Sequence, residues 1–203
     1  MTRIIAGAAR GRRLAVPPAG TRPTADRVRE SLFSALESAL MSWSGRRVID
    51  LYAGSGALGL EALSRGASHA LLVERDRSAV EVIRANIVAV GLAGAVVVGR
   101  DVDQVLAQPQ SPPGYDLVLA DPPYDLAPSR VTAVLTALAV GGWLADGATV
   151  VLERAARPAP AQGHRPARGG RPGPMPVDWP DGYEPARTRA YGDTVLHVAT
   201  YRG

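Results

Sequence analysis

The sequence predicts a doubly wound α/β domain, in which helices cover both faces of a parallel β-sheet. Short apolar runs rich in β-branched residues recur along the chain, and each is followed by a segment with apolar residues at helical spacing. These runs are continuously apolar, which is typical of strands that are buried on both faces. A glycine-rich turn directly follows the first of them. A chain of 203 residues is long enough for one such core and an appendage.

The first segment of the chain is basic and leads into a helix. Residues 1–29 contain seven arginines and one acidic residue. From Thr24, which can cap the first turn, apolar residues recur every three or four positions up to Trp43, and Gly45 ends the pattern. We therefore predict a basic N-terminal extension with an amphipathic helix over residues 1–44, and a second domain over residues 45–203.

The second domain alternates between strands and helices. Helices are expected to begin after the glycine turn, at Ser78, at Val102 and at residue 129. Right-handed crossovers would connect the parallel strands. The predicted strands comprise residues 47–52, 70–74, 95–98, 116–120 and 149–153.

The last part of the chain departs from this alternation. Residues 156–185 include eight prolines and five glycines interspersed with arginine, a composition that buries too little apolar surface to order itself. We predict a flexible Arg/Pro/Gly-rich loop there. Residues 194–201 alternate between apolar and polar positions and are rich in β-branched residues, which predicts a closing edge strand.

Composition excludes several classes of protein. The chain has no cysteine and its three histidines lack ligand spacing, so we expect no metal site and no thiol chemistry. The uncharged runs are too short for a membrane span, and the apolar run near the N-terminus is too short for a signal peptide. We therefore expect a cytoplasmic protein without a membrane partner, and a monomer.

The distribution of charge indicates a polyanionic partner. Arginines are concentrated at the start of the chain and again in residues 154–177, which contain five arginines and no acidic residue. The sequence pI is about 9.9. Such basic segments favour nucleic acid because they neutralise phosphates and release counterions. The alternative is a basic protein with solubilising tails.

The glycine turn carries the pattern of an adenosine-cofactor site. Residues 54–59 match G-x-G-x-x-G between a predicted strand and a predicted helix, and Glu74 ends the next strand, where it can accept ribose hydroxyls. Asp50, four residues before Gly54, would repel a pyrophosphate but suits the ammonium and sulfonium of S-adenosylmethionine. Asp101 can accept from the adenine amino group. The alternatives are that Asp50 and Asp101 only cap helices. The predicted cofactor residues are Asp50, Tyr52, Ala53, Gly54, Ser55, Gly56, Glu74, Arg75, Asp101 and Asp121.

A second motif, Asp-Pro-Pro-Tyr, follows the fourth strand of the second domain. Two prolines fix the backbone and remove two donors, which leaves carbonyl groups able to accept from a guest. An exocyclic base amine is a poor nucleophile until acceptors hold both of its N–H bonds. The Asp121 side chain and the Pro122 carbonyl can supply these acceptors, and Tyr124 can stack on the base. The alternative is a rigid loop with a structural aspartate. The predicted catalytic residues are Asp121, Pro122, Pro123 and Tyr124.

Together these motifs resemble those of a known family. The stretches 50–62, 73–76 and 121–124 look like the RsmD family, bacterial small-subunit rRNA guanine-N2 methyltransferases. Residues 3–14 and 22–33 resemble the basic N-terminal extension of that family, and residues 191–194 resemble its last motif. The resemblance covers nearly the whole chain except residues 156–185, an insertion longer than we expect for the family.

The resemblance implies a class I S-adenosylmethionine-dependent methyltransferase fold of the Rossmann-like type. It implies a seven-stranded, mostly parallel sheet with an antiparallel last strand. The cofactor would be S-adenosylmethionine, with S-adenosylhomocysteine as product. The acceptor would be a guanine of 16S rRNA, within the small ribosomal subunit or an assembly intermediate. The arginines expected to contact RNA are Arg3, Arg10, Arg12, Arg13, Arg22, Arg27 and Arg29.

Other functions stay open at this point. The motif at residues 121–124 alone also fits a DNA adenine-N6 methyltransferase, so the N-terminal segment carries the distinction. A non-catalytic RNA-binding assembly factor would have no need for free acceptors at that motif. A dehydrogenase would bind a dinucleotide, which Asp50 disfavours.

Overall fold

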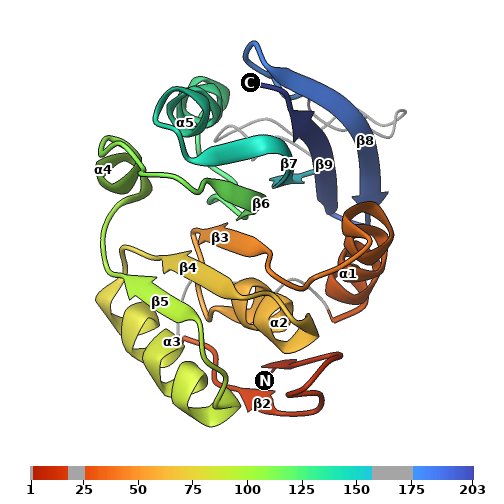
Figure 1. Cartoon of the computed structure of the whole chain (residues 1–203), viewed down its shortest axis with the longest axis vertical. Helices are drawn as coiled ribbons and strands as arrows, with labels where there is room; N and C mark the ends of the chain where they lie inside the picture. The colour runs from red at the N-terminus through yellow and green to blue at the C-terminus, as the bar shows by residue number, and fades with distance from the viewer. Residues whose placement is uncertain (1, 18–25, 157–175) are drawn as a thin grey trace, which may run out of the picture.

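The structure, a computed structural model, describes residues 2–17, 26–156 and 176–203. In this part of the chain a seven-stranded sheet has the order β5-β4-β3-β6-β7-β9-β8 (Figure 1). Its strands are β3 (Arg47–Leu51), β4 (His69–Val73), β5 (Ala95–Val98), β6 (Tyr115–Ala120), β7 (Leu144–Ala155), β8 (Tyr183–Tyr191) and β9 (Thr194–Tyr201). The helices are α1 (Asp26–Leu40), α2 (Ala57–Arg65), α3 (Arg77–Val90), α4 (Val102–Leu106) and α5 (Pro128–Val140).

The sheet is mostly parallel. The five strands from β5 to β7 pair in parallel, and β9 is antiparallel to both of its neighbours, β7 and β8. The predicted α/β fold with a seven-stranded sheet and an antiparallel last strand is therefore confirmed.

Two predictions for the C-terminal part were wrong. The strand β8 lies partly within the stretch expected to be a loop, and it is β8 rather than β9 that forms the sheet edge. Residues 184–190 of β8 are all exposed, so this strand has no hydrophobic pattern that sequence reasoning could detect. In contrast, β9 lies between two strands and buries residues on both faces, which produces its clear signal. Residues 157–175 of the predicted loop lie outside the described residues.

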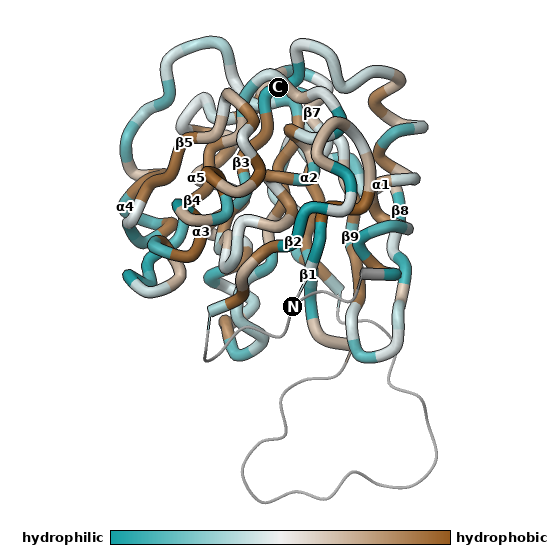
Figure 2. Tube along the Cα trace, turned by 90° about the horizontal axis from the view of Figure 1, so that it is seen from below, coloured by the Kyte–Doolittle hydropathy of each residue, from teal (hydrophilic) through white to brown (hydrophobic). Residues whose placement is uncertain are grey.

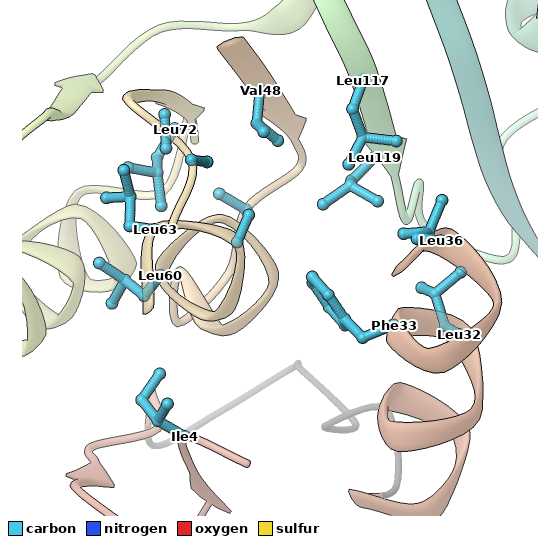
Figure 3. Packing of buried hydrophobic residues seen from close by; sticks show 14 of the residues in the cluster. Ile4, Leu32, Phe33, Leu36, Val48, Leu60, Leu63, Leu72, Leu117 and Leu119 are labelled. Carbon is cyan, nitrogen blue, oxygen red and sulfur yellow. The ribbon is translucent and has the colours of Figure 1, made fainter. Parts of the chain in front are cut away.

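Two hydrophobic clusters hold the layers together. Helices α1, α2 and α3 pack on one face of the sheet, and α4 and α5 pack on the other. Figure 3 shows Phe33 and Leu36 of α1 pointing toward Leu119 of β6, and all three are at most 2% exposed. Each such side chain contributes about 1.5–3 kcal/mol when fully buried. The interior strands are therefore fixed from both sides.

The N-terminal segment forms a small hairpin that joins the same core. The strands β1 (Thr2–Arg3) and β2 (Arg13–Leu14) pair antiparallel, and Figure 2 shows them near the N-terminus. Ile4 and Leu14 are each 1% exposed and belong to the cluster of α1 and α2. Gly7 has φ +82°, and a Cβ there would lie 1.8 Å from the Ser64 carbonyl oxygen, so only glycine permits this approach. The division at residue 44 stays a prediction.

The helix ends agree with the sequence in part. Asp76 caps α3 by accepting from the Ala79 amide at 2.9 Å, so the predicted cap, Ser78, lies inside the helix. Helix α1 ends at Leu40, before the predicted stop at Gly45, and Thr24 lies outside the described residues. None of the helices within the described ranges has the length and apolar character that crossing a membrane requires.

Candidate active site

A cavity of about 470 Å³ opens at the carboxyl ends of β3, β4 and β6. Strands β3 and β6 are neighbours from which the crossovers lead to opposite faces of the sheet. Ligands of doubly wound sheets bind at such a switch point, and the volume is in the range of small-molecule sites. The cavity is lined by Val16, Arg29, Asp50, Tyr52, Ala53, Gly54, Ser55, Ala57, Leu58, Val73, Glu74, Arg75, Asp76, Asp101, Val102, Asp121, Pro122, Pro123 and Tyr124.

Glu74 ties the glycine turn to the end of β4. Its Oε2 accepts from the Gly54 amide at 2.9 Å, and its Oε1 accepts from the Asp76 amide at 2.9 Å. A carboxylate has about four acceptor positions, so Glu74 can still receive two hydroxyl donors on its cavity side. The turn and the acid predicted to face a ribose are thus one connected unit.

Gly56, predicted to bind the cofactor, is not among the lining residues. It has φ +76°, and a Cβ at this position would lie 2.9 Å from Cδ2 of Leu72. Its role is therefore to let the turn lie against β4, since a larger residue would be both strained and obstructed.

Asp50 lies on β3, 1% exposed, and faces the first turn of α2. Its Oδ2 accepts from the Gly59 amide at 2.9 Å, so it caps the turn as the alternative interpretation required, and it also lines the cavity. Burial raises the pKa of Asp50 to about 8; the Gly59 hydrogen bond lowers it and the nearby charge of Glu74 raises it further. A cation in the cavity would favour the charged form of this group.

Asp101 likewise combines two contacts. Its Oδ1 caps α4 by accepting from the Asp103 amide at 3.0 Å, while its Oδ2 lies 3.4 Å from Nη1 of Arg75. Asp101 and Arg75 both line the cavity, on the side of β5. The capping contact therefore fixes the carboxylate at the cavity wall.

Tyr52 adopts a backbone conformation that is rare for a residue with a side chain. Its φ is +62°, at the point where β3 enters the glycine turn. The adjacent Ala53 amide donates to the Val73 carbonyl at 3.0 Å and holds the turn in place. Such conformations cost about 1–3 kcal/mol and are concentrated at functional sites. Burial raises the pKa of the Tyr52 hydroxyl, so the ring is neutral at physiological pH.

The Asp-Pro-Pro-Tyr segment continues β6 into the cavity. The Asp121 amide donates to the Leu51 carbonyl at 3.4 Å, which places the segment beside the end of β3. The Pro123 carbonyl accepts from the Leu126 amide at 2.9 Å. Among the described residues, none donates a hydrogen bond to the Pro122 carbonyl. Of the two proline carbonyls, that of Pro122 is therefore available to accept a hydrogen bond from a ligand.

Tyr124 stands at the mouth of the cavity. It is 37% exposed, and its hydroxyl lies 3.4 Å from Oε1 of Glu153 and 3.4 Å from Oγ1 of Thr194. Burial raises the pKa of the Tyr124 hydroxyl. The ring is held at its hydroxyl end and keeps an open part for contact with a planar group.

The predicted RNA-contacting arginines are not all at the surface. Arg3, Arg10, Arg12, Arg13 and Arg27 are exposed, and Arg22 lies outside the described residues.

Arg29 does not fit the surface role predicted for it. It is 1% exposed on the buried face of α1, and it lines the cavity. Its Nη1 donates to Oγ1 of Thr2 at 2.8 Å and its Nη2 donates to the Arg3 carbonyl. A guanidinium in this position holds the hairpin from inside, and its predicted contact with RNA stays a prediction.

Sequence reasoning missed other parts of the cavity wall. Val16 enters from the N-terminal segment, and no motif pointed to it. The apolar residues Ala57, Leu58 and Val73 lie within the stretches that carry the family resemblance but were not predicted to line the site, and Val102 carried only the signal of a core. Asp76 belongs to the stretch 73–76 that resembles the family, but it was not predicted as a site residue. In the described ranges, no group of three or more histidine, cysteine or acidic residues is placed to hold a metal ion.

The chain is similar to proteins of known classification. Residues 2–166 match the family model described as conserved hypothetical protein 95. The ribosomal RNA small subunit methyltransferase D of Escherichia coli is 42% identical over 152 residues, which are 74% of this chain and 73% of that protein.

Solved structures of methyltransferases are also similar to this chain. A putative methyltransferase from Escherichia coli, yhhF, has a TM-score of 0.79 and 32% identity, covering 100% of this chain and 98% of that one. An RNA methyltransferase from Salinibacter ruber in complex with S-adenosyl-L-homocysteine has a TM-score of 0.59 and 19% identity, covering 89% and 94%, and supports the fold alone. The chain therefore belongs to the conserved hypothetical protein 95 family, the RsmD family of methyltransferases.

Proposed function

We propose that the protein transfers a methyl group from S-adenosylmethionine to the exocyclic N2 of a guanine in 16S rRNA. The observation that carries this proposal is the placement of Asp121 and the Pro122 carbonyl in the same cavity as Asp50, Glu74 and Asp101. One group of oxygens suits an amine on an aromatic ring, and the other suits an adenosyl cation. The name of the Escherichia coli relative supports rRNA as the substrate class.

The cavity fits the cofactor by the chemistry of its donors and acceptors. Glu74 would accept the ribose hydroxyls and Asp101 the adenine amino group, while Asp50 would face the cationic end. When bound, S-adenosylmethionine supplies a methyl group on a sulfonium. The buried position of Asp50 favours a positive ligand, because a nearby cation offsets the cost of burying the charged carboxylate.

The base would be held by the end of β6. Asp121 and the Pro122 carbonyl accept the two N–H bonds of the exocyclic amine, which localises the nitrogen lone pair and turns it toward the methyl group. Tyr124 stacks on the ring through its exposed part. Bound S-adenosylmethionine would supply the methyl group and take back the electron pair of its carbon–sulfur bond, and Asp121 or water would take the proton that the amine nitrogen loses. Catalysis then depends on positioning and charge complementarity.

The hairpin would provide the first contact with RNA. The exposed arginines of residues 3–13 and Arg27 would supply positive charge for RNA phosphates. The substrate is rRNA within a small subunit or an assembly intermediate, which places the reaction in the cytoplasm.

Transfer of a labelled methyl group tests this function. We expect the wild type to label small ribosomal subunits or their rRNA, with N2-methylguanosine as the product after digestion. Asp121→Ala should bind S-adenosylhomocysteine like the wild type and lose at least about 100-fold in transfer, in line with losses for single groups that stabilise a reaction centre. Asp125→Ala is the matched control, because Asp125 is an exposed aspartate beside the motif that does not line the cavity.

Two results would contradict the proposal. Labelling of duplex DNA with N6-methyladenine as the product would assign the protein to the DNA adenine enzymes instead. Stabilisation by NAD rather than by S-adenosylmethionine would reject the cofactor; a true ligand at 100 times its Kd should stabilise by about 2.7 kcal/mol.

A further inference from the structure

The N-terminal hairpin and the glycine turn are joined by one buried side chain, that of Asn86 in α3. Asn86 is 2% exposed. Its Oδ1 accepts from the Ala15 amide at 2.8 Å, and its Nδ2 donates to the Ala15 carbonyl at 3.0 Å and to the Ser55 carbonyl at 2.9 Å. The carboxamide therefore uses both of its donors and its acceptor to connect two segments that are 40 residues apart in the chain.

Both of these segments belong to the proposed site. Ala15 directly follows β2, which carries the exposed Arg13, and precedes Val16 in the cavity wall. Ser55 lies in the glycine turn and also lines the cavity. A shift of the hairpin would thus move Val16 and, through Asn86, would pull on the turn that holds the cofactor.

Arg29 also bonds the hairpin and lines the cavity, whereas the hairpin contacts of Ser64 and Arg12 lie away from the glycine turn. Ser64 accepts from the Ala9 amide at 2.9 Å and donates to the Ala6 carbonyl at 2.5 Å, which fixes the hairpin on the far end of α2. Arg12 donates to the Ala89 carbonyl at 2.6 Å, at the end of α3. In the described part of the chain, Asn86 is the side chain that bonds the hairpin segment and the glycine turn at once.

We propose that Asn86 is a positioning residue that couples RNA binding on the hairpin to cofactor binding in the turn. RNA that fixes the hairpin would fix Ala15, and Asn86 would transmit this restraint to Ser55. By linkage, the cofactor would strengthen RNA binding by the same factor. This inference rests on the proposed function, because it takes rRNA and S-adenosylmethionine as the two ligands.

The coupling factor tests the proposal directly. It is the Kd of S-adenosylhomocysteine measured alone, divided by its Kd in the presence of saturating unmethylated small-subunit rRNA. We expect a factor of at least about five in the wild type, the lower end of typical couplings. Asn86→Ala should bring the factor close to one, and it should weaken S-adenosylhomocysteine binding even without RNA.

Two further variants separate coupling from a general loss of structure. Asn86→Asp is nearly isosteric and keeps an acceptor for the Ala15 amide, but it lacks the donor to Ser55, so it should also lose the coupling. Ser64→Ala is the matched control: it loosens the hairpin on α2 without touching the turn. It should weaken RNA binding and keep the wild-type factor.

Hydrogen exchange of the wild type provides a second readout that needs no variant. Exchange in a peptide covering residues 52–58 should slow when rRNA binds. A coupling factor of one in the wild type would overturn the proposal. A folded Asn86→Asp whose coupling factor equals that of the wild type would overturn it as well. Failure of the wild type to bind S-adenosylhomocysteine at all would instead reject the proposed function.

Discussion

The raised pKa of Asp50 predicts that cofactor binding releases a proton. With a pKa of about 8, the buried carboxyl group is about 97% protonated at pH 6.5. A cationic ligand beside Asp50 stabilises its carboxylate, so binding at this pH should release close to one proton. An α-amino group has a pKa of roughly 7.7–8.0, so the cofactor ammonium keeps its charge and contributes little to this count.

The same reasoning gives the pH dependence of affinity. Between pH 5.5 and 6.5 the ionised fraction of Asp50 rises about tenfold, so the Kd of S-adenosylmethionine should fall about tenfold. Below pH 8 each further decrease of one pH unit costs about 1.4 kcal/mol of binding free energy, because the proton of Asp50 must be removed before the ion pair forms.

Calorimetry in buffers of different ionisation enthalpy measures the proton count. Asp50→Asn is the control, because it keeps an oxygen that can accept from the Gly59 amide and has no proton to lose. Asp50→Asn should bind S-adenosylmethionine more weakly than the wild type. Its binding should release no proton from this position, and its Kd should not change with pH over this range. Absence of proton release in the wild type, or equal release in Asp50→Asn, would refute the assignment of Asp50 to the cationic end.

Three further predictions concern stability, the base and RNA. Because the folded-state pKa of Asp50 lies above its ordinary value of 3.8, wild-type stability falls as pH rises from about 4 to 8. Asp50→Asn should therefore match the wild type near pH 4 and exceed it above pH 8, by at most about 6 kcal/mol in chemical unfolding. Tyr124→Phe should keep the KM for RNA and Tyr124→Ala should raise it roughly 5- to 150-fold, the equivalent of about 1–3 kcal/mol of stacking, and equal KM values would exclude stacking. Replacing exposed Arg10 and Arg13 by glutamine should reduce the slope of log K against log salt by up to about 1.4–1.8, at roughly 0.7–0.9 for each phosphate that is no longer neutralised, and an unchanged slope would remove both from the interface.

The centre of the fold follows from the sequence because local and global signals agree there. Strands β3, β4 and β6 are apolar on both faces, and each is followed by a turn that the sequence marks with glycine, proline or an acidic residue. The carboxyl ends of neighbouring parallel strands meet at one edge. The acids at the ends of these strands are therefore predictable as members of one site from their positions in the sequence alone.

The parts that were missed lack a periodic signal. Residues 184–190 of β8 are exposed, and the strand is held along its length by pairing with β9, a contact that composition does not reveal. Arg29 was assigned by its charge, but its position on the buried face of α1 decides its role. Val16 and Asn86 depend on where the hairpin docks, which is set by tertiary contacts such as that of Gly7 with Ser64.

The proposal that Asp121 binds the exocyclic amine of a guanine for methyl transfer is tested most directly in cells. Small-subunit rRNA would be mapped by mass spectrometry in a strain that lacks the protein, after complementation with the wild type or with Asp121→Ala. We expect one N2-methylguanosine to be absent in the deletion strain, restored by the wild type and not restored by Asp121→Ala. Restoration by Asp121→Ala, or an rRNA unchanged by the deletion, would contradict it.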